Sequence, residues 1–287
     1  SKGLLIIKYK DKEMNEADFE TKYIDVNGVK TCYIEEGQGE PVILIHGGGA
    51  GANSYGNWFA SLPLFGKKFR AIAIDMIGFG KSEGPAVIGA DCSQKTRYDH
   101  LAGFIKAMGF EKATLVGNSM GGATAMGVAI EYPGLVDKLV LMGSAGLNTE
   151  ISEALMPILK YDFTKEGMVK MVQALTNDDF VITDEMIDYR FANSIDPSNK
   201  EAYGNVMEWI KSQGGLFYED EYIAKITQKT LVVNGKNDLV VPLTHAHKFL
   251  ELINDSWGYI VPHCGHWAMI EHPEDFASAV IQFIESH

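Results

Sequence analysis

The sequence predicts an α/β protein in which a mostly parallel sheet carries helices on both faces. Short, continuous apolar runs alternate with segments of helical length along most of the 287 residues. Strands buried on both faces have such uninterrupted runs, and strand–helix alternation is typical of parallel sheets. Several runs end in glycine-rich loops, and open parallel sheets bind ligands outside the carboxyl ends of their strands. We therefore expect the functional residues at those strand ends.

The predicted sheet begins with a β-hairpin and continues with buried strands. An Asn-Gly pair joins the alternating segments 21–26 and 29–36, which is a strong hairpin signal. Helix-length segments such as 96–109 and 123–133 separate the later strands. Those strands are predicted at the apolar runs 42–45, 70–76, 113–116, 138–144, 230–238 and 258–263. For the first twenty residues, disorder and an extra strand both remain open.

One long segment interrupts this alternation. Residues 147–218 show no clear strand, but helical patterns such as 168–176 and 200–215. The insertion starts where a predicted strand ends, which favours a cap over the carboxyl edge rather than an ornamental helical subdomain. We therefore predict a core domain of residues 1–146 and 219–287 and a helical cap, or lid, of residues 147–218.

Composition and charge exclude several classes of protein. The formal net charge of −13 disfavours binding to nucleic acid or to an anionic membrane surface. No apolar run approaches the roughly 18 residues of a membrane span, and the run at 4–7 is too short for a signal-peptide core. Cys32, Cys92 and Cys264 are widely spaced, which favours reduced thiols over a disulfide framework. We expect a soluble, cytoplasmic protein.

A serine on a glycine-rich turn is the first candidate catalytic residue. In LVGNSMGG (115–122), Ser119 follows the predicted strand 113–116 and precedes a predicted helix. A G-x-S-x-G elbow lifts the serine hydroxyl above the end of the sheet, at the N-terminus of the next helix. Glycines are needed where side chains would collide with neighbouring backbone. The flanking elements favour a nucleophile over a tight turn with an incidental serine.

A serine nucleophile needs a base, and the base needs an orienting acid. Strand-end positions in the chain order Ser…Asp…His point to Asp238 and His266. Asp238 ends the first buried strand after the insertion, although alone it would be interpreted as a turn or helix-cap residue. His266 follows Gly265 on the loop after the last strand. Together the three positions are far more specific than any one of them.

Other histidines are weaker candidates, and no metal or organic cofactor is expected. His263 competes with His266 but lies closer to the strand itself. His245 and His247 have the spacing of a metal-binding pair, but no third ligand is near in sequence, so we place them on a helix surface. The glycine run at 46–51 lacks the spacing and the Lys-Ser/Thr of a phosphate-binding loop.

The oxyanion of an acyl-transfer reaction needs two backbone N–H donors. One should come from Met120, directly after the nucleophile. The other should come from HGGGAG (46–51), at Gly48 or the adjacent Gly49, unless this run is only a flexible turn. These features predict a serine hydrolase of the α/β-hydrolase fold.

Beyond these motifs, the sequence resembles the meta-cleavage product hydrolases of that fold. The similarity extends from about residue 21 to 285 and is strongest to the branch in carbazole degradation, whose substrate carries a 2-aminophenyl group. A serine nucleophile disfavours the related dehalogenases and epoxide hydrolases, which use aspartate. The stretches that carry the similarity are 46–58, 75–82, 115–122, 141–146, 161–169, 174–178, 209–218 and 262–276.

The resemblance implies a reaction. Family members hydrolyse a C–C bond in 2-hydroxy-6-oxo-hexa-2,4-dienoates, here a 6-aryl dienoate, to 2-hydroxypenta-2,4-dienoate and an aromatic acid such as anthranilate or benzoate. The implied steps are enol–keto tautomerisation with His266 as proton shuttle, attack by Ser119, and hydrolysis of an acyl-enzyme. Asp238 would orient the histidine. Relatives assemble as dimers or larger, so a homodimer is expected.

The resemblance also implies a site for the dienoate anion. The family's polar contacts fall on Asn57, Asn118, Arg190 and Trp267. Arg190 can bind a carboxylate through two parallel hydrogen bonds, although without the resemblance it could equally be a surface arginine. Trp267 could equally be core packing. The apolar subsite for the ring is not assigned.

Three other functions compete with this interpretation. A general carboxylesterase on the same triad would need no anion site at Arg190 and Asn118 and would turn over simple esters quickly. A ligand-binding receptor on a hydrolase fold would expose a partner motif, and the sequence offers none. A purely structural protein would have no reason to keep serine, aspartate and histidine at three strand ends.

Overall fold

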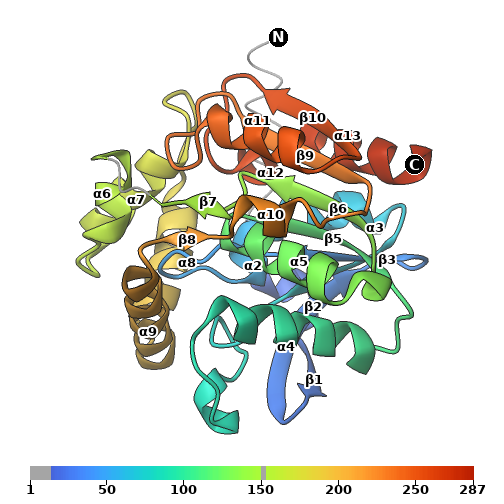
Figure 1. Ribbon diagram of the computed structural model, residues 1–287. Coiled ribbons are helices and arrows are strands. Elements are labelled where there is room, and N and C mark those ends of the chain that lie inside the picture. The colour runs from blue at the N-terminus through green and yellow to red at the C-terminus, as the bar shows by residue number, and fades with distance from the viewer. Residues whose placement is uncertain (1–13, 150–152) are drawn as a thin grey trace.

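The computed structural model describes residues 14–149 and 153–287 and contains one eight-stranded sheet (Figure 1). The strand order is β1-β2-β4-β3-β5-β6-β9-β10. All neighbours from β4 to β10 pair in parallel, and only β2 is antiparallel to its neighbours β1 and β4. The predicted fold class is therefore confirmed. The strands are Lys22–Val26, Val29–Glu36, Pro41–Ile45, Arg70–Ile74, Ala113–Asn118, Val136–Met142, Thr230–Gly235 and Ser256–Val261 for β1–β6, β9 and β10.

Helices cover both faces of the sheet, because the central strands are apolar on both sides. Neighbouring residues such as Ile43 and Leu44 on β3 enter two different cores, as the two-residue period of a strand requires. One core includes α4 (Gln94–Ala107), α5 (Met120–Glu131) and α11 (Leu243–Leu252). The other includes α2 (Ser54–Trp58), α3 (Leu62–Gly66), α12 (Ala268–Glu271) and α13 (Pro273–Ser286). The short α10 (Asp220–Ile223) packs against α5 and α11.

The segment between β6 and β9 is mainly helical and gathers beside one end of the sheet (Figure 1). Side-chain caps define the starts of its three longer helices: Thr164, Thr183 and Asp196 each accept a hydrogen bond from a backbone N–H three residues later. The helices are α6 (Met156–Leu159), α7 (Lys165–Leu175), α8 (Asp184–Ile195) and α9 (Pro197–Gln213).

The prediction that this segment holds no strand was wrong at its two ends. Strands β7 (Leu147–Asn148) and β8 (Leu216–Phe217) pair antiparallel where the chain leaves and re-enters the core. Two residues are too few to show an alternating pattern, and only their pairing makes them strands. Of the twenty N-terminal residues left open above, residues 1–13 lie outside the described residues, while Glu16–Asp18 form a short 3-10 helix.

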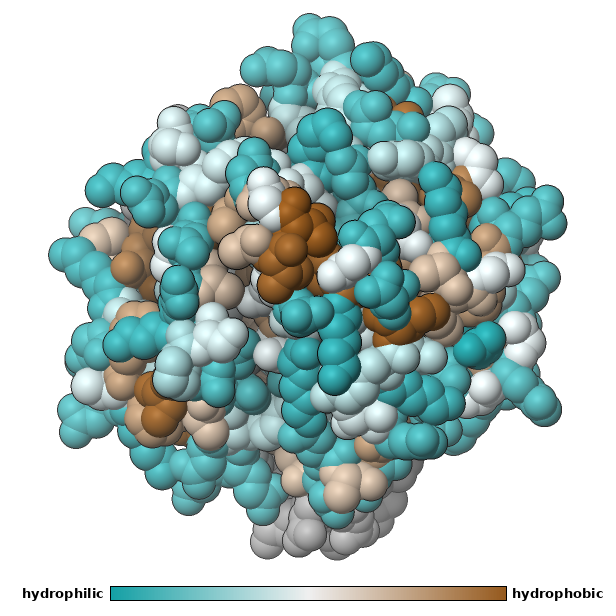
Figure 2. Space-filling view, turned by 90° about the horizontal axis from the view of Figure 1, so that it is seen from below, coloured by the Kyte–Doolittle hydropathy of each residue, from teal (hydrophilic) through white to brown (hydrophobic). Residues whose placement is uncertain are grey.

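The face of the molecule seen from below has no extended apolar area (Figure 2). In the view from below, hydrophilic side chains predominate and hydrophobic ones form separate groups (Figure 2). Isolated exposed apolar residues are normal for a folded protein. No helix of the described residues has the length and apolar character needed to cross a membrane.

The turn between β5 and α5 is packed so closely that it requires glycine. A Cβ built on Gly117 would lie 2.4 Å from the carbonyl oxygen of Gly121, and one built on Gly121 would lie 2.2 Å from the carbonyl oxygen of Ile45. Backbone cannot yield as a flexible side chain can. Helix α5 therefore sits directly on the ends of the central strands only because these positions carry no side chain.

We predict that Gly117→Ala destabilises the protein by about 1–3 kcal/mol, because overpacking forces the backbone apart. Gly134→Ala is the control, since nothing lies within 4 Å of its added methyl group, and its effect should stay within about 1 kcal/mol. Urea unfolding monitored by circular dichroism measures both. Equal stability of the two variants would contradict the steric argument.

Candidate active site

Ser119 occupies a strained backbone conformation between β5 and α5. Its φ of 55° and ψ of −119° are rare for a residue with a side chain, at a cost of about 1–3 kcal/mol. Backbone hydrogen bonds fix this conformation: Ser119 N–H donates to the Met142 carbonyl at 3.2 Å, and its carbonyl accepts from Gly122 at 2.9 Å and Ala145 at 3.0 Å. The side chain is partly exposed. The serine therefore projects from a rigid turn, as an elbow nucleophile should.

The predicted oxyanion residues lie close to one another. Met120 is the first residue of α5, where backbone N–H groups have no partner within the helix and the helix dipole is positive. A Cβ built on Gly48 would lie 2.5 Å from Met120 Cε, and one built on Gly47 would lie 3.5 Å from Ser119 Cβ. The glycine run thus borders the serine, where a second N–H donor is needed.

The buried ring of His46 holds the start of the glycine run in place. Its Nε2 accepts a hydrogen bond from the Met76 N–H at 3.0 Å. The proton must therefore be on Nδ1, which donates to the Gly47 carbonyl at 2.6 Å. Burial lowers the pKa of His46, so the ring is neutral at neutral pH. This histidine is structural.

Asp238 and His266 form a buried pair, as the sequence predicted from their strand-end positions. His266 Nδ1 lies 2.8 Å from Asp238 Oδ2. Asp238 Oδ1 accepts the N–H groups of Val240 at 2.8 Å and Val241 at 2.9 Å. Because an ionised carboxylate only accepts, Nδ1 must carry the proton, and Nε2 is left to act as a base.

Ser119 Oγ forms no hydrogen bond with any other described residue. Hydrogen bonds between a nucleophile and its base are often long without substrate and shorten in the complex. The other histidines are placed differently. His263 is exposed, His247 is exposed on α11, and His245 is half-buried on the same helix. Within the described residues, no group of three or more His, Cys, Asp or Glu side chains could hold a metal ion.

Asn57 and Asn118 are joined in a buried network at the end of β5. Asn57 Nδ2 donates to Asn118 Oδ1 at 3.0 Å. Asn118 Nδ2 donates to the Met142 carbonyl at 2.9 Å and to the His266 carbonyl at 3.4 Å. The amide of Asn118 is therefore occupied by protein groups and links the ends of β5 and β6 to α2 and to the His266 loop. A direct contact between Asn118 and substrate stays a prediction.

Arg190 is a buried cation that has no partner of opposite charge among the described residues. It lies on α8 and is 9% exposed, and its guanidinium carbon is 5.0 Å from the centre of the Trp267 ring. Its Nε has no hydrogen-bond partner, and the whole side chain has no hydrogen bond or ion pair to any described residue. Burial lowers the pKa of Arg190 to about 10, so it is charged at neutral pH. An unpaired buried charge is costly, which indicates a site that an anion completes.

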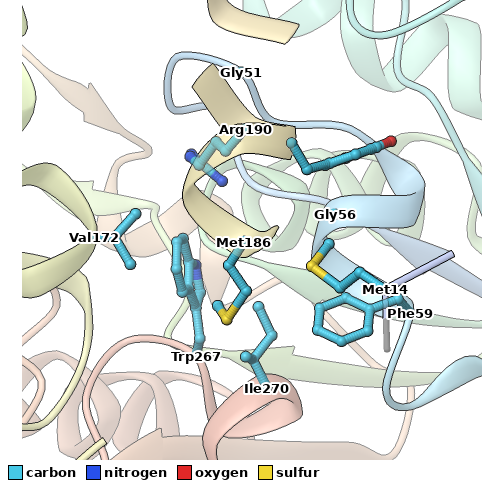
Figure 3. A pocket seen from close by; sticks show the side chains of 10 residues that line it. Met14, Gly51, Gly56, Phe59, Val172, Met186, Arg190, Trp267 and Ile270 are labelled. Atoms are coloured by element: carbon cyan, nitrogen blue, oxygen red, sulfur yellow. The ribbon is translucent and has the colours of Figure 1, made fainter. Parts of the chain in front are cut away.

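The arginine faces the glycine run and closes one side of a cavity. A Cβ built on Gly49 would lie 2.8 Å from Arg190 Nη2. The cavity is partly open and small, with a volume of about 20 Å³. Arg190 lies beside Trp267, with Met14 and Phe59 on the opposite side (Figure 3). The lining is apolar apart from Arg190 and Tyr189 and includes Val172, Met186 and Ile270.

Two residues near the pair were not singled out from the sequence. A Cβ on Gly143 would lie 3.1 Å from His266 Nδ1 and 3.2 Å from Asp238 Oδ2, so the pair packs against bare backbone. Glu271 is buried five residues after His266 and accepts a hydrogen bond from Gly265 N–H. A glutamate directly after the apolar stretch WAMI was a signal that could have identified it.

Known proteins resemble this chain along most of its length. The family model for the α/β-hydrolase fold matches residues 40–273. The 2-hydroxy-6-oxo-6-(2'-aminophenyl)hexa-2,4-dienoic acid hydrolase of Metapseudomonas resinovorans is 55% identical, over 95% of this chain and 93% of that protein.

Solved structures agree with the sequence relatives. A serine hydrolase involved in carbazole degradation superposes with a TM-score of 0.87 at 52% identity, covering 94% of this chain and 100% of the other. A meta-cleavage product hydrolase from Pseudomonas fluorescens IP01 superposes with a TM-score of 0.86 at 34% identity, covering 94% and 99%. The relatedness therefore includes the helical segment as well as the sheet.

We predict that Asp238→Asn slows labelling of Ser119 by a fluorophosphonate about 10³–10⁴-fold. The asparagine keeps Oδ1 for Val240 and Val241 but turns an NH₂ group toward His266 Nδ1, which forces the proton onto Nε2 and removes the base. Asp137→Asn, at the opposite end of β6, is the control and should label at the parent rate. Mass spectrometry of the labelled protein gives both rates. Parent-like labelling of Asp238→Asn would remove it from the triad.

Proposed function

The chain belongs to the α/β-hydrolase fold family and, within it, to the meta-cleavage product hydrolases, and from this premise we propose that it hydrolyses a C–C bond in a 2-hydroxy-6-oxo-6-aryl-hexa-2,4-dienoate. Its products are 2-hydroxypenta-2,4-dienoate and an aromatic acid. The 2-aminophenyl dienoate, named for the relative that is 55% identical, is the proposed substrate, and anthranilate is then the acid.

The unpaired Arg190 is the observation that carries this proposal. An esterase of neutral substrates gains nothing from a buried cation, which is expensive to desolvate. A dienoate carboxylate supplies the missing negative charge and can accept two parallel hydrogen bonds from the guanidinium. Arg190 also lies against the glycine run that borders Ser119. The anionic end of the substrate and its reacting ketone are thus bound at neighbouring positions.

The first step converts the dienol to its keto form. The proton on O2 is lost and a proton is added at C5, with His266 as the carrier. This step is needed because a carbon leaving group is poor unless its charge can be delocalised. In the keto form, electrons from the breaking C5–C6 bond flow through the C3–C4 double bond to the carbonyl oxygen at C2.

Ser119 then attacks the C6 carbonyl while its proton passes to Nε2 of His266. The N–H groups of Gly48 and Met120 stabilise the oxyanion. Collapse of the oxyanion breaks the C5–C6 bond, and the dienoate leaves after it takes up the proton from His266. Water then attacks the acyl-enzyme, again with His266 as base, and releases the aromatic acid. Asp238 stabilises each imidazolium that forms.

Residues 147–218 act in this scheme as the cap domain over the core of residues 1–146 and 219–287. The support is that α8 supplies Arg190 and α7 supplies Val172 to the cavity beside Trp267. The cap thus binds the anion while the core carries the nucleophile. Closing a site between two parts of the chain also excludes water, which strengthens the charged interactions inside it.

We also propose that the enzyme is a cytoplasmic homodimer. Reduced cysteines support the location, since Cys32, Cys92 and Cys264 are all free thiols. The sheet edge supports the assembly. Strand β10 has no charged residue, and it exposes Trp257 and Ile260, whereas protected edges usually carry charges or proline.

We expect the purified protein to bleach a yellow 6-(2-aminophenyl) dienoate. The Ser119→Ala variant should do so at a rate at least about 10³-fold lower. The phenyl analogue should be cleaved with a lower kcat/KM. Stopped-flow absorbance follows the dienoate, and chromatography identifies anthranilate. A folded parent protein that hydrolyses p-nitrophenyl acetate but leaves both dienoates unchanged is the result expected of a general carboxylesterase instead.

Arg190→Met should raise KM for the dienoate about 100-fold, because the carboxylate loses two charge-assisted hydrogen bonds. The same variant should hydrolyse p-nitrophenyl acetate within about threefold of the parent rate. That ester carries no carboxylate for Arg190 to bind, so the substitution removes no interaction with it. Steady-state kinetics on both substrates make the comparison within one protein. Equal losses of activity on both substrates would show that Arg190 supports the folding of the site rather than the binding of the anion.

A further inference from the structure

We propose that Glu271 is a positioning residue whose carboxylate fixes the His266 loop to the end of helix α7. The proposal deepens, and rests on, the proposed C–C hydrolysis, because it concerns how the base of that reaction is held. The Glu271 carboxylate accepts hydrogen bonds from the backbone N–H groups of Gly265 and Asn177. It acts through the backbone on the N-terminal side of His266.

The carboxylate joins two segments that are far apart in sequence. Glu271, the last residue of α12, is 4% exposed. Its Oε2 accepts the Gly265 N–H at 2.8 Å, one residue before His266. Its Oε1 accepts the Asn177 N–H at 2.8 Å, just after α7 ends. One side chain therefore holds the histidine loop and the helical cap at once.

A direct contact reinforces this link. The His266 N–H donates to the Leu175 carbonyl at 2.8 Å. There is no space between the two segments, since a Cβ on Gly265 would lie 2.8 Å from that same carbonyl oxygen. Helix α7 packs against α8, the helix of Arg190. The groups that bind the anion and the base that moves protons therefore share one rigid framework.

The chemistry of the contact calls for a carboxylate rather than an amide. Two backbone N–H donors point at the side chain, and an ionised glutamate offers an acceptor oxygen to each. Glutamine would accept one bond and oppose the other N–H with its own NH₂ group. Burial is the largest influence and, with Asp179, raises the pKa of Glu271 above its ordinary value, although the two N–H donors and His272 act to lower it. The Cys264 thiol lies 3.9 Å from Oε2.

Small displacements of the loop matter because His266 must reach Asp238 and Ser119 together. Misplacing a catalytic group by about 1 Å can cost about 100-fold in rate. If Glu271 holds the loop, its loss lowers the rates of proton transfer and nucleophilic attack more than it weakens substrate binding. A residue that only stabilised the fold would lower the melting temperature without this selectivity.

Glu271→Gln is the first test, with Glu35→Gln as its matched control. Glu35 also loses charge-assisted bonds, from Lys22 at 2.8 Å and Arg70 at 2.9 Å, but lies on β2, where it pairs with Ile72 in the middle of β4. We expect Glu271→Gln to lower kcat and the rate of fluorophosphonate labelling about tenfold to 100-fold. KM should stay within about threefold, and Glu35→Gln should leave all three unchanged.

A second pair of variants changes the geometry without changing the charge. Asn177→Pro removes the N–H that donates to Oε1, and Asn177→Ala keeps it. The preceding Thr176, at φ −118° and ψ 158°, already has the backbone that a following proline requires. Asn177→Pro should reproduce the loss of Glu271→Gln, and Asn177→Ala should not. The acid limb of kcat/KM should move to lower pH in the proline variant, because an imidazolium farther from Asp238 is less stabilised.

The outcomes separate this inference from the proposed function. Parent-rate labelling and an unshifted acid limb in both Glu271→Gln and Asn177→Pro would overturn the positioning role. If Glu271→Gln does not fold, the proline and alanine pair decides alone. If the parent labels rapidly but cleaves no dienoate, the proposed reaction fails, while the labelling rates still decide the role of Glu271.

Discussion

The structure depends on one backbone constraint: Ser119 must be held in a conformation that residues with a side chain rarely adopt. Holding this residue at a φ of 55° requires β6 to supply a hydrogen-bond acceptor and requires α5 to press onto the strand ends. Close approach in turn requires bare backbone at Gly117 and Gly121. The central strands, the following helix and the hydroxyl are therefore placed by a single local arrangement.

The two buried charged residues of the site, Asp238 and Arg190, have opposite electrostatic surroundings. Asp238 receives two backbone N–H groups and the ring of His266, so its charge is satisfied before any substrate binds. Arg190 lies against the face of Trp267, a weaker partner than a carboxylate, and forms no ion pair with any described residue. The Asp238–His266 pair is thus satisfied in the protein alone, whereas the charge of Arg190 is left without a counterion among the described residues. Under the proposed function, that asymmetry assigns substrate selection to the cap and reactivity to the core.

Short sequence motifs predicted the features that depend on neighbouring residues, such as strand ends and tight turns. Strand-end positions identified Ser119, Asp238 and His266, and the structure brings Asp238 and His266 into contact. The pairing of Arg190 with Trp267 joins residues on different elements, and only tertiary packing creates it. The sequence also does not predict the interior hydrogen bonds of Asn118 or the role suggested for Glu271. An amide or a carboxylate is the same residue in the sequence whether it contacts substrate or backbone. The paired strands β7 and β8 were missed because two residues carry no period.

Those two short strands have a consequence for how the molecule can change. By pairing Leu147 with Phe217, they bring the two ends of the insertion side by side. The β7–β8 pair closes the insertion into a loop whose ends lie as close together as those of a tight turn. The entropy of closing that loop depends only logarithmically on the number of residues in it. Helices can be lengthened, exchanged or reshaped there with little thermodynamic effect on the strands that hold the nucleophile. Such an arrangement lets one catalytic scaffold acquire new substrate preferences by replacing a module.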